Sequence, residues 1–405
     1  MLRTWWPERA GNRPGRPVLW LLAGCVLLSA AGFWFVAGAG SDPLPIEVTP
    51  EELERALREF RFLQRREPVR SELLLLLAET AVRQNRLPTA LACLSEIPTG
   101  DQQAGVTARR LEAQVCLKAN QAVRLESAAG ELLRAAEAGT AVRPAELQLI
   151  EELLVFLFSL EYRFEERQQL LKQMAARRSL DVLLAKQLHF PALLASRTVQ
   201  QNQRLQRFLE EDPDHPPLVL AHARYLLSTA RLDDAEKLAD SMLAAHPSSA
   251  ESLAVALECR FERQALAEFS ALLSAAPAFQ PTEPWLLTQM RAEGAVQSGD
   301  RGLAKRYFEH LTAMDPSNPL YLQGLAGVTA TDTAEGAAER SRFLRRALLL
   351  AELRLTLAES DSDAGALRAV AETARKLGMP AAVQDFERLA NIAASGGSLQ
   401  GRSEQ

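Results

Sequence analysis

The sequence is poor in aromatic residues, cysteine and net charge. Only 6% of its 405 residues are Phe, Trp or Tyr, four are Cys, and the formal net charge is −5. The weak charge and a hydrophobic content of 47% exclude a disordered chain, and 21 Gly with 21 Pro are too few for a collagen-like one. The near-neutral charge gives no general reason to expect nucleic-acid binding, so we predict no nucleic-acid partner.

Motifs that hold metals, phosphates or nucleophiles are also missing. No pair of histidines has the i, i+4 spacing with an intervening Glu that binds zinc, and there is no GxSxG, P-loop or GxGxxG segment. We therefore predict no catalytic residue, no metal site and no cofactor. We expect a half-buried imidazole at His222 and solvated turn positions for His215 and His246.

Cysteine usage points to packing and not to a metal site. After Cys25 the chain has Cys93, Cys116 and Cys259, an odd number without a CxxC pair. We expect small buried side chains at these positions. A disulfide between Cys93 and Cys116 stays open if the compartment is oxidising.

A long uncharged segment, residues 18–39, lies near the N-terminus. Its 22 residues would span about 33 Å as a helix, enough for a hydrocarbon core of roughly 30 Å. Arginines dominate the preceding residues and acidic residues follow. By the positive-inside rule, residues 1–17 form a cytoplasmic tail, residues 18–39 a single-pass anchor, and the bulk of the chain lies on the periplasmic side of the membrane.

Two other interpretations of this segment stay open. Ala37-Gly38-Ala39 fits a signal-peptide cleavage pattern, although the apolar run is longer than a usual signal peptide has. Leu22-Ala23-Gly24-Cys25 resembles a lipobox that would place a lipid on Cys25, although a long apolar stretch follows it. All three interpretations place the bulk of the chain outside the cytoplasm.

Good helix formers dominate the rest of the chain, which predicts an all-α fold. Residues 40–50 contain three prolines and predict an extended linker. We expect divergent helical repeats over 51–212, clearer repeats over 213–350, a helix pair over 351–394 and a flexible tail over 395–405. The apolar run 153–160 is too short to span a membrane and predicts a buried helix.

A repeat of about 34 residues is visible in the second half of the chain. Four prolines recur at spacings of 34, 30 and 39 residues: Pro213, Pro247, Pro277 and Pro316. An alanine stands twelve residues before each of the last three, at Ala235, Ala265 and Ala304. Small residues also recur twelve positions before two of these alanines, at Ala223 and Ala292. Such spacing predicts pairs of helices that cross closely at small side chains.

These residues resemble the tetratricopeptide repeat (TPR) family. The best match is 285–318, with small Ala292 and Ala304, a turn at Gly299, bulky Phe308 and a final Pro316. Further matches are 216–249, 250–277 with a shortened first helix, 71–98, 104–135, 319–350 and 364–391, whereas 140–212 fits no unit well. The resemblance implies a right-handed α-solenoid of stacked helix pairs after the transmembrane helix.

In the family's register the first helix of each unit lines a concave groove. The resemblance places six residues at its exposed positions: Leu220, Arg224, Leu227, Gln289, Glu293 and Gln297. This mixed lining suits a protein partner bound as an extended peptide or a helix. It differs from the Lys/Asn/Arg set with which chaperone-binding TPR domains hold a C-terminal carboxylate, so we do not predict that ligand.

The predicted function is a membrane-tethered, non-catalytic scaffold that binds a protein partner on the extracytoplasmic side. Two alternatives belong to other classes. One is a structural envelope component that binds wall polymer. The other is a helical enzyme with its site in 140–212, where polar residues from separate helices would converge in a deep pocket.

Overall fold

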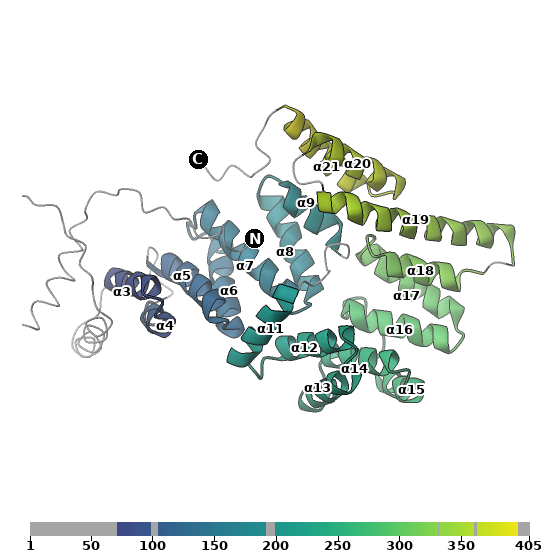
Figure 1. The fold of residues 1–405 in the computed structure, drawn as a ribbon, viewed down its shortest axis with the longest axis horizontal. Helices are drawn as coiled ribbons and strands as arrows, with labels where there is room; N and C mark the ends of the chain where they lie inside the picture. Colours follow the sequence, from purple (N-terminus) through teal and green to yellow (C-terminus); the bar gives the residue numbers. More distant parts are fainter. Residues whose placement is uncertain (1–70, 99–103, 192–198, 331, 360–362, 396–405) are drawn as a thin grey trace, which may run out of the picture. The chain divides into compact units, whose positions relative to one another are not determined.

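The computed structural model describes residues 71–98, 104–191, 199–330, 332–359 and 363–395. These residues form 18 α-helices and no strand (Figure 1), which confirms the all-α prediction. No helix in these ranges is long and apolar enough to cross a bilayer. The predicted anchor at 18–39, the linker at 40–50 and the tail beyond 395 lie outside the described residues.

The chain divides into two compact units, Met1–Ala108 and Arg109–Gln405. The described part of the first unit contains α3 (Ser71–Arg83), α4 (Leu87–Ser95) and the first residues of α5 (Ala104–Ala119). Helices α3 and α4 pack on each other. Ala78, Ala90 and Leu94 are fully buried between them, as expected for the match at 71–98.

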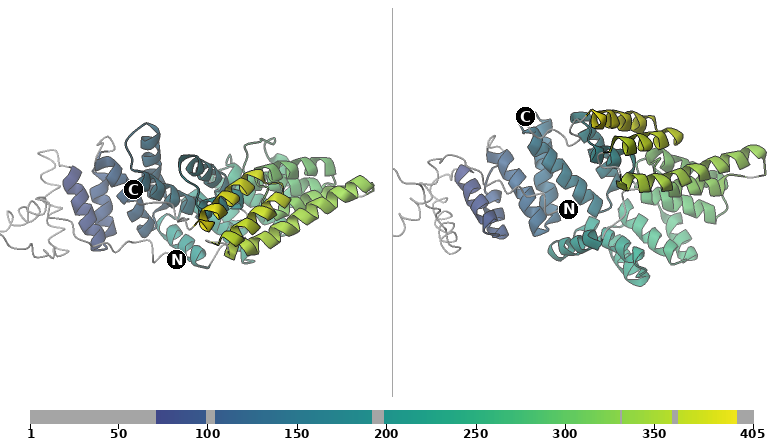
Figure 2. Two further views of the ribbon diagram at one scale, coloured as in Figure 1. Left: turned by 90° about the horizontal axis from the view of Figure 1, so that it is seen from above. Right: turned by 45° about the horizontal axis from the view of Figure 1, so that its top comes forward.

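The second unit contains the other helices, which Figure 2 shows from two further directions. They are α6 (Ala122–Glu137), α7 (Pro144–Leu160), α8 (Phe164–Arg177), α9 (Val182–His189), α11 (Val199–Glu211), α12 (Pro216–Ser228), α13 (Leu232–Ala245), α14 (Ala250–Glu262), α15 (Leu266–Ala275), α16 (Trp285–Gln297), α17 (Arg301–Met314), α18 (Pro319–Val328), α19 (Ala334–Glu359), α20 (Ala364–Lys376) and α21 (Pro380–Ala394). Consecutive helices pack as pairs: α12 on α13, α16 on α17, α18 on α19 and α20 on α21.

Small residues lie where the paired helices cross. Ala292 on α16 and Ala304 on α17 are fully buried, and Phe308 fills the space one helical turn further on. Gly299 turns the chain between these helices at φ +78°, a left-handed conformation that favours glycine. Ala223 and Ala235 are equally buried in the pair α12–α13. The predicted register of the units 216–249 and 285–318 is therefore confirmed.

The predicted shape of the unit 250–277 is wrong. Its first helix, α14, has 13 residues, the same as α12 and α16, while its second helix, α15, has only 10. Ala265, expected at the crossing, is instead the N-cap residue of α15. Phe269 lies at the crossing and is fully buried. The repeat register here is shifted by one helical turn relative to the alanine–proline spacing.

Helices α7 and α8 form a further pair that the sequence did not reveal. They are joined by a turn in which Tyr162 has φ +60°, equivalent to Gly299 in the pair α16–α17. Ala304 follows Gly299 by five residues, and the buried Arg167 follows Tyr162 by five residues. Arg167 therefore occupies in the pair α7–α8 the position that the small Ala304 occupies in the pair α16–α17. The apolar run 153–160 belongs to α7 and contributes buried leucines, as predicted.

Helix α9 connects this early part of the second unit to its last helices. Val182, Ala185 and Phe190 share one hydrophobic core with residues of α16 to α21, including Phe386. The His189 ring nitrogen Nε2 lies 2.7 Å from Asp385 Oδ2 on α21. Lys186 Nζ, which is buried, donates a hydrogen bond of 2.7 Å to the Leu357 carbonyl at the end of α19.

The three cysteines among the described residues are buried thiols. Cys93, Cys116 and Cys259 are free, so the disulfide between Cys93 and Cys116 is not formed. Burial raises the pKa of Cys116 and of Cys259 to about 12. These thiols are accordingly packing residues at neutral pH.

Candidate functional site

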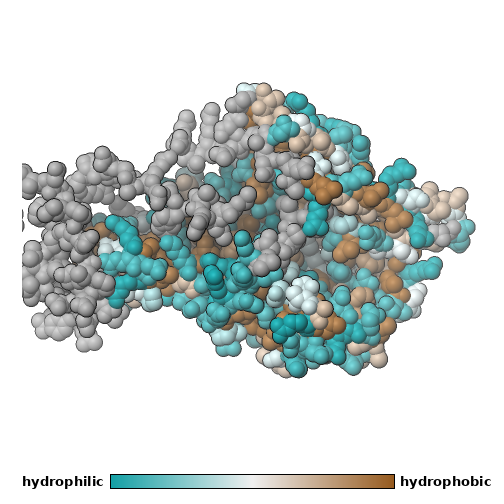
Figure 3. All heavy atoms as spheres, in the orientation of Figure 1, coloured by the Kyte–Doolittle hydropathy of each residue, from teal (hydrophilic) through white to brown (hydrophobic). Residues whose placement is uncertain are grey.

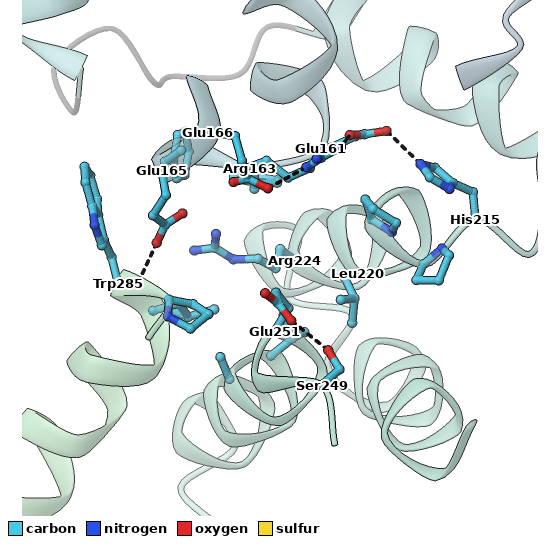
Figure 4. Close-up of a pocket in the computed structure, with 18 of the residues that line it drawn as sticks. Glu161, Arg163, Glu165, Glu166, His215, Leu220, Arg224, Ser249, Glu251 and Trp285 are labelled. Atoms are coloured by element: carbon cyan, nitrogen blue, oxygen red, sulfur yellow. Dashed lines mark hydrogen bonds and ion pairs between the residues drawn. The ribbon is translucent and has the colours of Figure 1, made fainter. Parts of the chain in front are cut away.

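A cavity of about 550 Å³ lies in the second unit where the turn between α7 and α8 faces α12, α14 and the start of α16. Figure 4 shows the site, with the acidic turn along one side and the starts of α12 and α14 opposite. The turn contributes the run from Glu161 to Glu166, and Pro284 and Trp285 close one end. A helix-pair turn and three first helices therefore supply its walls.

An ion-paired arginine organises the carboxylates of the turn. Arg163 Nη1 lies 2.9 Å from Glu126 Oε2 and 3.1 Å from Glu161 Oε2, and its Nε donates to Glu166 Oε1 at 2.9 Å. Burial alone would lower the pKa of Arg163, but the hydrogen bond and charge of Glu126, with the charge of Glu161, raise it. The guanidinium also stacks on Phe158, 4.4 Å from the ring centre.

His215 completes this cluster. Its Nε2 lies 3.1 Å from Glu161 Oε1, and both side chains are largely shielded from solvent. The prediction of a solvated turn histidine is therefore wrong: His215 precedes α12 in a turn, but that turn is covered by Glu161. Glu126, Glu161 and His215 have the ligand types of a metal site. Both carboxylates are already ion-paired with the Arg163 guanidinium, so we assign no metal here.

Glu165 is the most shielded carboxylate of the wall that has no arginine partner. Its Oε1 accepts a hydrogen bond of 2.6 Å from the Trp285 backbone N–H. Burial raises the pKa of the Glu165 carboxyl, and the hydrogen bond from Trp285 offsets only part of that rise. The Trp285 indole Nε1 is buried without a hydrogen-bond partner among the described residues. An acid and an aromatic ring thus lie side by side at one end of the cavity (Figure 4).

Arg224 projects from α12 into the middle of the site (Figure 4). Its Nε and Nη2 donate to Glu258 Oε2 and Oε1 of α14 at 2.8 and 3.0 Å. Its guanidinium lies 4.5 Å from the centre of the Tyr162 ring. Burial alone would lower the pKa of Arg224, but the charge of Glu258 and its hydrogen bond raise it. The positive charge of Arg224 is therefore matched inside the chain.

The opposite wall combines polar and apolar groups. Ser249 caps α14 by accepting from the Ser252 N–H, and its hydroxyl donates to Glu251 Oε2 at 2.8 Å. Leu220, Ala254 and Val255 supply the apolar surface. Neither Ser249 nor His215 is hydrogen-bonded to the other, so they do not form a nucleophile–base pair.

The predicted groove residues separate into two groups. Leu220 and Arg224 line the cavity, although Leu220 is 92% buried and Arg224 is ion-paired. Gln289 and Glu293 on α16 are half-buried, Leu227 is half-buried, and Gln297 is exposed at the end of α16; these four do not line the cavity. Burial, and then repulsion from Glu262, raise the pKa of Glu293.

The residues that sequence reasoning missed come from the α7–α8 turn. Glu161, Arg163 and Glu165 lie within 140–212, which fits no repeat unit by its side chains. The only available signal was the density of charges in the segment from Glu161 to Arg167, directly after an apolar run. A charged segment after a buried helix is usually a solvated turn, and the sequence does not show that this one faces α12.

The cavity carries an excess of negative charge beside aromatic rings. Five glutamates line it against two arginines, and Arg224 is already neutralised by Glu258 outside the lining. Tyr162, Phe164 and Trp285 add ring surfaces. Carboxylates and ring faces both attract cations, so the site is suited to a positively charged group such as a lysine or arginine side chain.

No family model and no curated protein matches the sequence. Among solved structures, the chain is similar to a tetratricopeptide repeat protein from Parabacteroides merdae, with 15% identity, a TM-score of 0.28, and 69% of this chain and 91% of that chain covered. It is similar to yeast Tom70, with 11% identity, a TM-score of 0.31 and coverages of 85% and 93%. It is also similar to the human IFIT1 dimer with m7Gppp-AAAA, with 13% identity, a TM-score of 0.34 and coverages of 87% and 96%. Of these structures, the one from Parabacteroides merdae is described as a tetratricopeptide repeat protein.

Proposed function

We propose that this protein is a non-catalytic scaffold, anchored in the membrane by residues 18–39, that binds a positively charged segment of a partner protein on the extracytoplasmic side. The observation that carries the proposal is the uncompensated negative charge of the cavity between the α7–α8 turn and α12, α14 and α16. The hydropathy of residues 18–39 supports the anchor, and the arginines before it with the acidic residues after it support the orientation.

Charge balance decides which kind of ligand the cavity favours. A shielded carboxylate without a cation is destabilised by lost hydration, as the raised pKa of Glu165 reflects. A ligand cation would restore the lost interaction at Glu165 and would also pair with the exposed Glu251, whose carboxylate accepts a hydrogen bond from the Ser249 hydroxyl. An anionic ligand would add repulsion instead, because Arg163 and Arg224 are already engaged.

The continuation of the acidic surface supports a segment rather than a single small ion. Glu293 occupies on α16 the position that Glu258 occupies on α14, and it has no cationic partner among the described residues. Glu258 and Glu293 are 35 residues apart, about one repeat. A chain that places one basic side chain in the cavity could present a second one to Glu293.

Peptide binding tests the proposal directly. Fluorescein-labelled 12-residue peptides of Gly, Ala and Ser with two central Arg, Lys, Gln or Glu residues would be titrated into the full-length protein in detergent. We expect the Arg and Lys peptides to bind, with an affinity that falls as salt rises. Equal binding of the Gln and Glu peptides, or no binding of any basic peptide up to millimolar concentration, would contradict it.

Matched variants locate the binding. Glu165→Gln and Glu251→Gln keep the side-chain shape and a hydrogen-bond acceptor but remove the charge. Each should therefore lower the affinity for the Arg peptide roughly three- to tenfold. Glu335→Gln, an exposed glutamate on α19, is the control and should change nothing. If all three variants bind alike, the cavity is not the site. Protease accessibility of the C-terminus in spheroplasts tests the orientation.

The convergence of polar side chains also favours a second candidate, the helical enzyme. Glu161 and Arg163 of the α7–α8 turn meet His215, which precedes α12, in one cavity, as expected of an active site that includes residues of 140–212. Their mutual hydrogen bonds leave no free base or nucleophile, which is why we prefer the scaffold. Turnover of a substrate by the purified protein that is lost in His215→Gln would reverse that preference.

A further inference from the structure

The solvent-facing side of α19 carries an apolar stripe. Leu344, Leu348 and Leu355 are 46%, 61% and 72% exposed. The other exposed large hydrophobic side chains of the described residues occur singly on their helices, which is ordinary for a protein surface. In Figure 3 brown side chains interrupt the hydrophilic surface in the region where Figure 1 places α19. Three exposed leucines in one row are not ordinary.

The spacing of the stripe is that of a coiled-coil seam. Leu344, Leu348, Ala351 and Leu355 are separated by four, three and four residues, the a/d alternation of a heptad. All four are exposed, and they lie on the face opposite Ala347, Leu350 and Leu357, which are buried against the rest of the unit. At 26 residues α19 is also the longest described helix, about 39 Å.

The side chains that flank the stripe identify its occupant. Arg345 and Glu352 are both exposed, and neither forms an ion pair within the described chain. They are seven residues apart, about 10 Å along the helix, too far to pair with each other. Both occupy the same heptad position, which in an antiparallel pair faces its own counterpart. Arg345 of one copy would then face Glu352 of the other, twice by symmetry.

The volumes of the stripe fit the same arrangement. An antiparallel pair centred between Leu348 and Ala351 sets each Leu348 against the small Ala351 of the other copy and each Leu344 against Leu355. Large side chains therefore meet small ones at the centre, where two helix axes approach most closely. Self-complementarity of both charge and volume is what a two-fold interface requires.

We infer that the protein forms a homodimer through an antiparallel coiled-coil contact between the α19 helices of two copies. Anchoring in a membrane would strengthen the contact, because it confines the copies to one plane and raises their effective concentration. This inference is independent of the acidic cavity, because α19 contributes no residue to it.

Mass photometry and sedimentation of the full-length protein in detergent test the interface. We expect the wild type to dimerise and Leu348→Glu to be monomeric, while Leu320→Glu, an equally exposed leucine on α18, remains dimeric. Circular dichroism melting confirms that each variant is folded. A wild type that stays monomeric up to about 100 µM, or a dimer that survives Leu348→Glu, would overturn the inference.

A charge swap tests the antiparallel register. Arg345→Glu sets two glutamates against each other, and Glu352→Arg sets two arginines against each other, so each should weaken dimerisation roughly tenfold. The double variant Arg345→Glu/Glu352→Arg restores both pairs and should dimerise like the wild type. A double variant as weak as the single ones would show that the two helices do not meet in this register.

Discussion

Arg224 and Glu258 are 34 residues apart, one repeat, and form a two-pronged ion pair between the first helices of neighbouring units. Arg224 lines the candidate cavity, and Glu258 lies outside its lining. The pair fixes the spacing of α12 and α14 at the place where the α7–α8 turn approaches them through Tyr162. Arg224, which we expected to contact a partner, thus also links α12 to α14.

Removal of either partner should destabilise the protein. Arg224→Ala leaves the shielded Glu258 without a cation, and we expect a loss on the order of 2 kcal/mol in the free energy of unfolding. Urea denaturation at pH 7 measures it. The double variant Arg224→Ala/Glu258→Ala should cost clearly less than the sum of the single variants. Additive costs would mean that the pair contributes nothing.

Gly324 on α18 should not tolerate alanine. A Cβ there would clash with the ring of Phe308, which is buried. We expect Gly324→Ala to lower stability by about 1–3 kcal/mol. Gly327→Ala on the same helix is the control, since a Cβ there meets nothing within 4 Å. That change should raise stability by up to about 1 kcal/mol through helix propensity. Thermal melting that moves both variants in the same direction would contradict the packing.

Ala304 should resist enlargement for a related reason. It is fully buried at the crossing of α16 and α17, so Ala304→Leu should cost about 1–3 kcal/mol through overpacking. Ala313→Leu, at an exposed position of the same helix, supplies the comparison. Equal melting temperatures for the two variants would show that the helix crossing lies elsewhere.

Glu293→Gln should weaken binding of the Arg peptide and raise the stability of the fold. Burial and the nearby Glu262 raise the pKa of Glu293, so its charge disfavours the folded state once the pH exceeds the unfolded pKa. At pH 7 the glutamine variant should be more stable by less than about 1 kcal/mol, because solvent screens this half-buried site.

The pH dependence supplies the check on Glu293. Below the ordinary pKa of a glutamate, both the folded and the unfolded protein carry a neutral Glu293, and the advantage of Glu293→Gln should vanish. Urea denaturation at pH 7 and pH 3.5 compares the two regimes. The same variant should bind the Arg peptide less tightly. A stability gain that persists unchanged at pH 3.5 would exclude the charge as its cause.

The units 216–249 and 285–318 were predictable because a small side chain at a helix crossing leaves a periodic signal. Ala223, Ala235, Ala292 and Ala304 are all fully buried. The signal failed at 250–277, where an alanine stands twelve residues before Pro277 by coincidence. The left-handed residue that precedes α15 is Gln264, not glycine, so the turn had no marker in the sequence.

The candidate site was only partly predictable. Leu220 and Arg224 followed from the family register, but the opposite wall did not. In the repeat pattern the crossing position is occupied by a small residue. In the pair α7–α8 this position holds the long, charged Arg167. Burial lowers the pKa of Arg167, and the charge of Asp315 on the α17–α18 connection opposes that shift. Contacts of this kind join segments far apart in the chain and have no periodic signature.

The contact of α9 with α21 affects the order in which the helices unfold. Stacked repeats generally fray from their outermost member inward, because that member touches a neighbour on one side only. Here the final pair is also fastened through His189 and Asp385 to a helix almost two hundred residues earlier. The pair α20–α21 should therefore not unfold before the rest of the unit. Truncation of the chain before α20 should also destabilise the packing of α9.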